Sequence, residues 1–66
     1  MKFGECLKEL RAAKNLSQMQ LANILKISQS AIAKWELGKT EPTASAIIML
    51  ARYFNETTDY ILGIVD

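Results

Sequence analysis

The segment from Ser28 to Glu36, SQSAIAKWE, has side chains of an unusual kind for an exposed helix face. At about 100° per residue, the apolar Ala31, Ile32 and Trp35 would share one side. The opposite side would carry an amide, a hydroxyl, a methyl and an ammonium group, from Gln29, Ser30, Ala33 and Lys34. Solvated helix faces usually carry charged pairs at i,i+4 spacing, whereas this face lacks bulk and negative charge. The composition raises the question of why an exposed face would lack both bulk and negative charge.

Capping signals place this segment in the second of two short helices. In LSQMQL, Ser17 is a candidate N-cap and Gln20 completes a capping box, which predicts a helix over residues 18–25. The pattern recurs in ISQSAI, where Ser28 caps a second helix that runs to Leu37. Because so few residues separate the two helices, we expect a tight turn between them.

Three further helices are predicted around this pair. Phe3, Leu7 and Leu10 recur at helical spacing, which indicates a first helix that ends near Lys14. Gly38 and Pro42 end the central pair and precede the next helix. The later helices are expected from about Thr43 to Phe54, and from a cap at Thr57 or Thr58 to Gly63. The sequence therefore predicts an all-α fold of about five short helices, in one domain over residues 1–66.

Composition excludes several classes of protein. The chain has 66 residues, half of them hydrophobic and 23% charged, and no apolar run approaches the roughly 20 residues of a membrane span. Glu5, Lys8 and Glu9 interrupt what would be the apolar part of a secretion signal, so we expect no such signal. With no histidine and one cysteine, general acid-base catalysis and a transition-metal site lack their usual groups. We therefore expect no enzymatic activity, no cofactor, no metal and no small-molecule ligand.

Charge is unevenly distributed along the chain. Residues 1–40 hold seven lysines or arginines against three glutamates, whereas residues 41–66 hold one arginine against four carboxylates. A basic half that faces a polyanion and an acidic half that faces away is one interpretation. The alternative is chance segregation in a short chain.

The two central helices are typical of a helix-turn-helix, in which Ala22 is the small residue where the backbones approach. The segments LSQMQLA, ISQSAIAKWELGKTEP and TTDYILG resemble the lambda-repressor and Cro-like domains, also called the xenobiotic-response-element family. The resemblance covers nearly the whole chain. It implies a DNA-binding domain that regulates transcription, most simply as a repressor that obstructs polymerase. Because the family is that of bacterial and phage regulators, it also implies a cytoplasmic location.

The resemblance implies that the helix over residues 28–37 enters the major groove of DNA. This groove is about 12 Å wide and lined by phosphates, which repel carboxylates and leave no room for bulk. Gln29 could pair with adenine, Ser30 could donate or accept, Ala33 could touch a thymine methyl, and Lys34 could reach guanine or phosphate. These candidate base contacts explain the composition of the face.

The resemblance also implies contacts with the DNA backbone. Gln18 and Ser28 lie at helix starts, where free N–H groups favour a phosphate. Lys39 and Thr40 follow Gly38 and resemble the family's second contact with the sugar-phosphate chain. The alternative is that Gln18 is a surface helix former and Lys39 a solvated loop charge.

Other residues in this region are predicted to be structural. Arg11 and Glu36 resemble the family's intramolecular ion pair; the alternative is that Arg11 binds a phosphate. Trp35 and Ile32 fall on the inner side of their helix, so we expect core packing and not base stacking. Together with Ala22, these residues are expected to hold the helix-turn-helix together.

Two positions depart from the family pattern. Lys26 stands where the turn commonly has glycine, and a left-handed conformation costs a non-glycine residue about 1 kcal/mol or more. We therefore predict that this short turn is wider than the family pattern gives. Thr43 lacks an acidic partner because Ala46 occupies the third helical position, so the capping box is incomplete.

The competing hypothesis is a protein-binding module, such as an antitoxin-like partner. Apolar residues on the outer side of the fourth helix and after Gly63 are available for a partner. The simplest partner is a second copy, which would place two recognition helices about 34 Å apart and predict a palindromic operator. The candidate dimer contacts are Ile48, Met49, Arg52, Ile64 and Val65.

Overall fold

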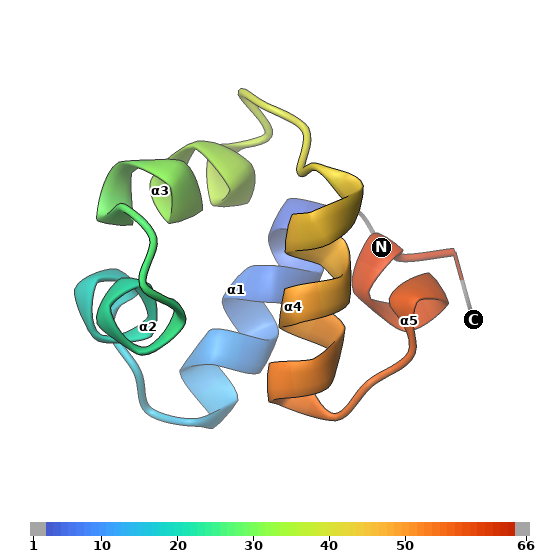
Figure 1. Cartoon of the computed structure of the whole chain (residues 1–66), viewed down its shortest axis with the longest axis horizontal. Helices are drawn as coiled ribbons and strands as arrows, with labels where there is room; N and C mark the ends of the chain where they lie inside the picture. The colour runs from blue at the N-terminus through green and yellow to red at the C-terminus, as the bar shows by residue number, and fades with distance from the viewer. Residues whose placement is uncertain (1–2, 65–66) are drawn as a thin grey trace.

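The computed structural model describes residues 3–64, which form five α-helices (Figure 1). The helices are α1 (Phe3–Ala13), α2 (Gln18–Leu25), α3 (Gln29–Leu37), α4 (Ala44–Phe54) and α5 (Thr58–Leu62). Helices α2 and α3 lie on one side of α1 and α4, and α5 lies on the other. These described residues contain no strand, and the predicted all-α fold is confirmed. None of their helices is long and apolar enough to cross a membrane.

Side-chain caps start helices α2 to α5 at the predicted places. The Ser17 hydroxyl accepts the Gln20 N–H at 3.0 Å, and the Gln20 carboxamide oxygen accepts the Ser17 N–H at 2.8 Å. Ser28 and Thr43 cap α3 and α4 in the same way, without a reciprocal partner. Of the two threonines considered for α5, the cap is Thr57. Each cap satisfies an N–H group that the helix itself leaves free.

The turn between α2 and α3 is tight, so the prediction of a wider turn was wrong. Lys26 adopts the left-handed conformation, with φ 59° and ψ 43°, directly after Leu25. The N–H groups of Lys26 and Ile27 both bond to the carbonyl oxygen of Ala22, the latter at 3.0 Å. These hydrogen bonds offset a conformational cost of about 1 kcal/mol, and the turn keeps the geometry expected of glycine.

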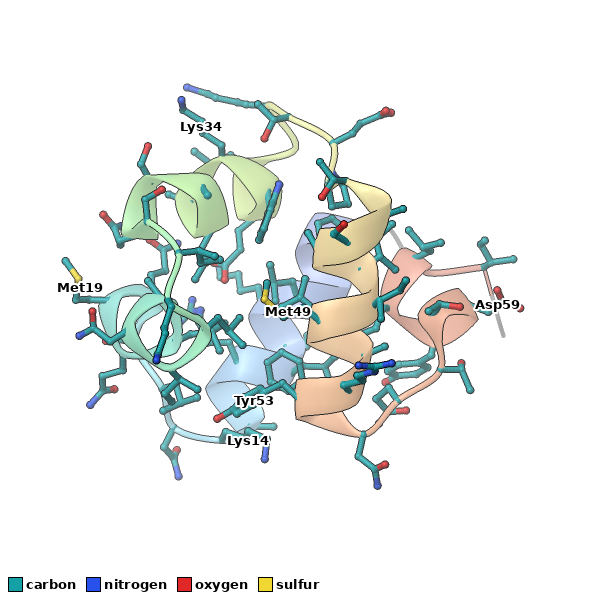
Figure 2. All side chains as sticks on the ribbon, viewed as in Figure 1. Lys14, Met19, Lys34, Met49, Tyr53 and Asp59 are labelled. Atoms are coloured by element: carbon teal, nitrogen blue, oxygen red, sulfur yellow. The ribbon has the colours of Figure 1, made fainter. Side chains whose placement is uncertain are left out.

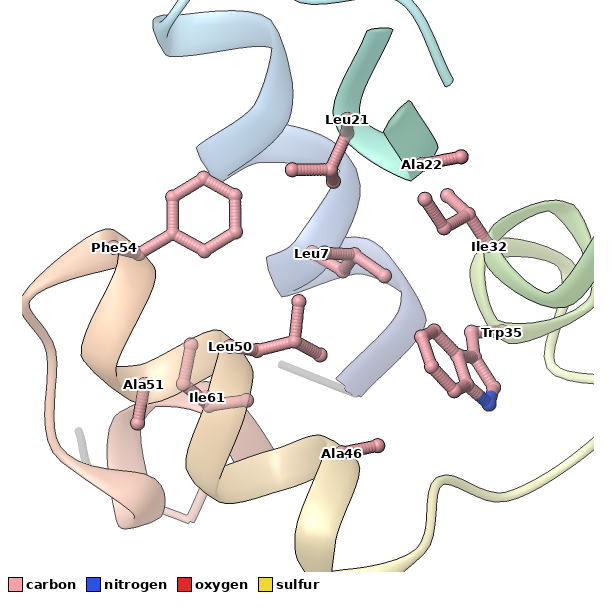
Figure 3. Close-up of a cluster of buried hydrophobic side chains, with 10 residues drawn as sticks. All are labelled: Leu7, Leu21, Ala22, Ile32, Trp35, Ala46, Leu50, Ala51, Phe54 and Ile61. Atoms are coloured by element: carbon pink, nitrogen blue, oxygen red, sulfur yellow. The ribbon is translucent and has the colours of Figure 1, made fainter. Parts of the chain in front are cut away.

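The core lies between the helices and draws residues from all five of them (Figure 3). Leu7 of α1 lies at its centre, and five large side chains in this cluster are fully buried: Leu7, Leu21, Ile32, Leu50 and Ile61. Burying each of these residues contributes about 1.5–3 kcal/mol before entropy is counted. The packing of α3 against Leu7 and Leu21 determines which of its faces remains outside.

Candidate nucleic-acid interface

The exposed face of α3 carries the four residues predicted to contact bases. Ser30 and Lys34 are exposed, and Gln29 and Ala33 are half-buried. Figure 2 shows Lys34 pointing away from the body of the molecule, at the opposite end from Asp59 of α5. The face thus combines short or amide side chains with one free ammonium group and remains accessible to a partner.

A chain of side-chain hydrogen bonds links this face to the interior. Nε2 of Gln29 donates to Oε1 of Gln18 at 2.7 Å, and Nε2 of Gln18 donates to Oε1 of Glu36 at 3.0 Å. Glu36 in turn accepts two bonds from Arg11, from Nε at 2.7 Å and from Nη2 at 3.0 Å. Residues from α1, α2 and α3 therefore act together to orient Gln29.

The Arg11–Glu36 pair is the interior end of this chain. The side chains are only 15% and 4% exposed, and Nη1 of Arg11 also donates to the carbonyl oxygen of Leu16 at 2.7 Å. Burial by itself raises the pKa of the Glu36 carboxyl. Hydrogen bonds from Arg11 and Gln18 and the charges of Arg11 and Lys8 lower this pKa by more than burial raises it, so the pKa lies below the ordinary value for glutamate. Glu36 is therefore ionised and turned inward, away from the exposed face.

Gln18 was predicted to contact a DNA phosphate, but its side chain also makes hydrogen bonds within the protein. Its side chain is half-buried and bonded to both Glu36 and Gln29. Each of the two glutamine Nε2 groups uses one hydrogen in the chain and retains a second. Gln29 also retains its carbonyl oxygen, so its amide can still donate and accept side by side, as pairing with adenine requires.

The loop after α3 carries the predicted second backbone contact. Gly38 caps α3 in the left-handed conformation, with φ 74°, and donates to the carbonyl oxygens of Lys34 and Trp35. The N–H of Lys39 bonds to the carbonyl oxygen of Lys34 at 2.9 Å. Lys39 and Thr40 are exposed beside the end of α3, and Ser28 is exposed at its start. The candidate backbone contacts thus flank the candidate base contacts.

The inner side of the helix-turn-helix is apolar. Ala22 is 1% exposed and Ile32 is fully buried. The Trp35 ring meets Phe3 edge to face, with 6.1 Å between centroids, and is 9% exposed. A ring in this environment is not available to stack on a base.

The candidate dimer contacts on α4 and after α5 differ in exposure. Ile48 is 46% exposed and Ile64 is 67% exposed, whereas Met49 is half-buried. Arg52 is exposed, and Val65 lies outside the described residues. Met49 lines a groove of about 390 Å³ between α3 and α4, and Figure 2 shows it pointing toward that space.

Sequence reasoning did not predict the Gln18–Gln29 hydrogen bond or the close approach of Gly4 to the backbone of α3 at Trp35. The two glutamines are 11 residues apart on different helices, and no periodicity relates them. Gly4 lies inside α1, where a glycine suggests a close backbone approach, but the sequence does not indicate which backbone. Between residues 3 and 64, no group of three or more cysteine, aspartate or glutamate side chains could hold a metal ion.

Comparisons with known proteins agree with this geometry. A family model described as Helix-turn-helix matches residues 7–61. The chain is 44% identical over 63 residues to the HTH-type transcriptional activator BcrR of Enterococcus faecalis, covering 96% of this chain and 31% of that protein. It is 42% identical over 57 residues to the HTH-type transcriptional regulator AnsR of Bacillus subtilis, covering 86% and 49%.

A solved structure has the same fold. A transcriptional regulator from Listeria innocua superposes with a TM-score of 0.88 at 31% identity, covering 98% of this chain and 61% of that one. The chain thus spans about a third to about half of these curated relatives, and somewhat more of the solved structure. The sequence motifs, the helical arrangement and these similarities agree, and the chain belongs to the helix-turn-helix family of lambda-repressor and Cro-like domains.

Proposed function

We propose that this protein binds a specific site on double-stranded DNA and regulates transcription, with α3 reading bases in the major groove. One observation supports this proposal above the others. The only carboxylate of α3, that of Glu36, is turned inward onto Arg11, which leaves Gln29, Ser30, Ala33 and Lys34 on a face without negative charge. A groove lined by phosphates favours such a face.

In this proposal the four residues have different tasks. Gln29, held by Gln18, pairs with adenine, and Lys34 reaches guanine or a phosphate. Ser30 and Ala33 contribute a hydroxyl and a methyl contact. Gln18, Ser28, Lys39 and Thr40 contact the backbone and fix the register, whereas the α3 face supplies the base preference.

Two copies are proposed to bind together. Ile48, Met49, Arg52, Ile64 and Val65 are the candidate contacts, and a two-fold axis through them would separate the recognition helices by about 34 Å. The expected site is a palindrome. Sedimentation of the DNA-free protein tests the pairing in solution, and a single monomeric species across micromolar concentrations would contradict it.

A bound dimer would cover its operator and block polymerase there, so we propose that the protein represses transcription. BcrR is named as an activator, and the direction of regulation is therefore read out in a transcription assay on the bound site. Because the chain is similar to regulators from bacteria, whose DNA lies in the cytoplasm, we propose a cytoplasmic location. BcrR and AnsR are longer than this chain, so the proposal concerns the helix-turn-helix domain and not the rest of those proteins.

Selection from a pool of randomised DNA duplexes tests the proposal. The wild-type protein and a Gln29→Ala, Lys34→Ala double variant are compared at the same salt concentration, since phosphate contacts make binding salt-dependent. The wild-type protein should enrich a palindrome, and the folded double variant should lose that preference. Asn23→Ala, an exposed change on α2, is the control and should enrich the same site.

A wild-type protein that enriches no sequence even at low salt would contradict the proposal. The α3 face and the groove beside Met49 would then favour the second candidate function, a protein-binding module. That groove is lined mainly by apolar side chains from α3, α4 and the preceding turn, which is the specific observation in its favour.

A further inference from the structure

Gly4 lies where the backbone of α1 closely approaches the last turn of α3. The residue is buried in the first turn of α1. A Cβ atom added there would lie 2.5 Å from the carbonyl oxygen of Trp35 and 2.9 Å from that of Glu36. Ordinary contacts begin at 3.4 Å, so any side chain would push the two helices apart by about 1 Å along this line.

The atoms that face Gly4 belong to the backbone of α3. A side chain could rotate away from an added methyl group, but a helical carbonyl group moves only with its helix. The carbonyl oxygen of Trp35 also accepts the N–H of Gly38 at 3.1 Å, and this bond belongs to the cap that ends α3. Displacing this carbonyl would therefore also displace the loop that carries Lys39.

The two ends of α3 rest on different parts of the molecule and share one partner, Gln18 of α2, which is bonded to Gln29 at the start and to Glu36 near the end. At its start, Gln29 is bonded to Gln18 of α2, and Ser28 caps the helix. At its end, the backbone rests on Gly4, and Trp35 packs on Phe3. A change at Gly4 would act directly on the second end alone, against the bonds that Glu36 makes with Arg11 and Gln18, and would therefore tilt the helix.

We propose that Gly4 is a positioning residue for DNA recognition: by allowing the backbones of α1 and α3 to touch, it sets the tilt of α3 and the place of Lys39. This inference rests on the proposed reading of DNA by α3. Functional sites tolerate displacements of about 0.5 Å, which is less than the shift a methyl group requires. Alanine is a better helix former than glycine, so helix propensity alone would favour Gly4→Ala.

The test compares Gly4→Ala with a core variant of similar stability far from α3. Ile61 of α5 is fully buried, and Ile61→Val or Ile61→Ala is chosen to match the melting temperature of Gly4→Ala. Residual dipolar couplings measured without DNA give the orientation of α3 relative to α1. Affinity and its salt dependence are then measured on the duplex that the wild-type protein enriches from the randomised pool, below all melting temperatures.

We expect α3 to be tilted in Gly4→Ala and unchanged in the Ile61 variant. Affinity for the enriched duplex should fall about tenfold in Gly4→Ala alone, the effect of removing one good hydrogen-bonded pairing with a base. The slope of log K against log salt should fall in magnitude by about 0.9 for each phosphate that the variant no longer neutralises.

An α3 orientation that is unchanged in Gly4→Ala would overturn the inference, whether or not DNA is bound. Equal losses of affinity in Gly4→Ala and the matched Ile61 variant would also overturn it, because stability alone would then explain the effect. If Gly4→Ala is unfolded at 25 °C, the comparison is repeated at low temperature in trimethylamine oxide, which favours the compact state. Failure to fold there, while Ile61→Ala folds, would assign Gly4 to stability alone. A wild-type protein that enriches no duplex contradicts the proposed function instead.

Discussion

Helices α3 and α4 have similar lengths, nine and eleven residues, but are attached to the molecule by different interactions. Four residues of α4 are buried, including Leu50 and Phe54, and apolar packing holds the helix in place. α3 buries only Ile32 and Trp35, and is joined to its neighbours by directional bonds through Glu36 and Gln29. A helix that leaves one face free for a partner has less surface to bury, and here hydrogen bonds with fixed geometry supply the orientation.

The largest expected change in the free energy of unfolding comes from α4, the helix held by apolar packing. Leu50→Ala removes a fully buried side chain from α4 and should lower the free energy of unfolding by about 2–5 kcal/mol. For a domain of 66 residues, this is a large part of the total stability. Chemical denaturation followed by circular dichroism measures the change.

The matched control for Leu50→Ala is Ile48→Ala on the same helix, with both variants measured at protein concentrations where sedimentation shows a monomer. Because Ile48 is 46% exposed, its truncation should change the free energy of unfolding by much less, within about 0.5 kcal/mol. Equal losses at the two positions would show that α4 is not held by its buried face.

A smaller effect is expected where α3 depends on a buried charge. Glu36→Gln keeps the size of the side chain but leaves Arg11 without its anionic partner, which should cost about 2 kcal/mol of unfolding free energy. Glu41→Gln, in an exposed loop, is the control and should be nearly neutral. A neutral Glu36→Gln would mean that the ion pair does not hold α3 in solution.

The same carboxylate makes part of the stability dependent on pH. The folded-state pKa of Glu36 lies below its usual value near 4.5, so its contribution is fully present above that value and is lost as pH falls through the folded pKa. The difference in unfolding free energy between wild type and Glu36→Gln should therefore be constant near neutral pH and narrow below about pH 4.5. Denaturation curves from pH 7 to pH 3 measure it, and a constant difference throughout would contradict the coupling.

The smallest expected effect concerns the loop after α3. Lys39→Ala should weaken binding to all DNA sequences alike and reduce the salt slope by about one per subunit, since a phosphate contact carries no base information. Fluorescence anisotropy on the enriched duplex and on an unrelated duplex, at several salt concentrations, measures both quantities. A loss confined to the enriched duplex would instead make Lys39 a base contact.

The sequence predicted those features that depend on neighbouring residues. The caps at Ser17 and Ser28 and the left-handed ends at Gly38 and Gly63 are local interactions, so the helix boundaries could be predicted closely. The turn at Lys26 was predicted wrongly, because the cost of its conformation can be estimated locally but the compensating bonds to Ala22 depend on the folded helix. The fold class followed from this local pattern.

The geometry of the candidate site depends on contacts between helices. The Gln18–Gln29 bond and the contact of Gly4 with the Trp35 carbonyl join residues 11 and 31 positions apart, so neither follows from helical period or from capping rules. The residue types on the α3 face could be predicted, whereas the way that Gln29 is held could not. Base selectivity depends on how the Gln29 amide is held, because an amide must be fixed in orientation to present its donor and its acceptor to one base.

The central claim is that Gln29 on α3 reads a base, and removing its amide tests the claim most directly. The dissociation constants of wild type and Gln29→Ala are measured on the enriched duplex and on duplexes with each base pair of one half-site replaced. If the claim is correct, Gln29→Ala becomes indifferent to the base at one position, with a loss of about 1–3 kcal/mol there, and still discriminates at the others. Discrimination that is unchanged at every position would contradict the account.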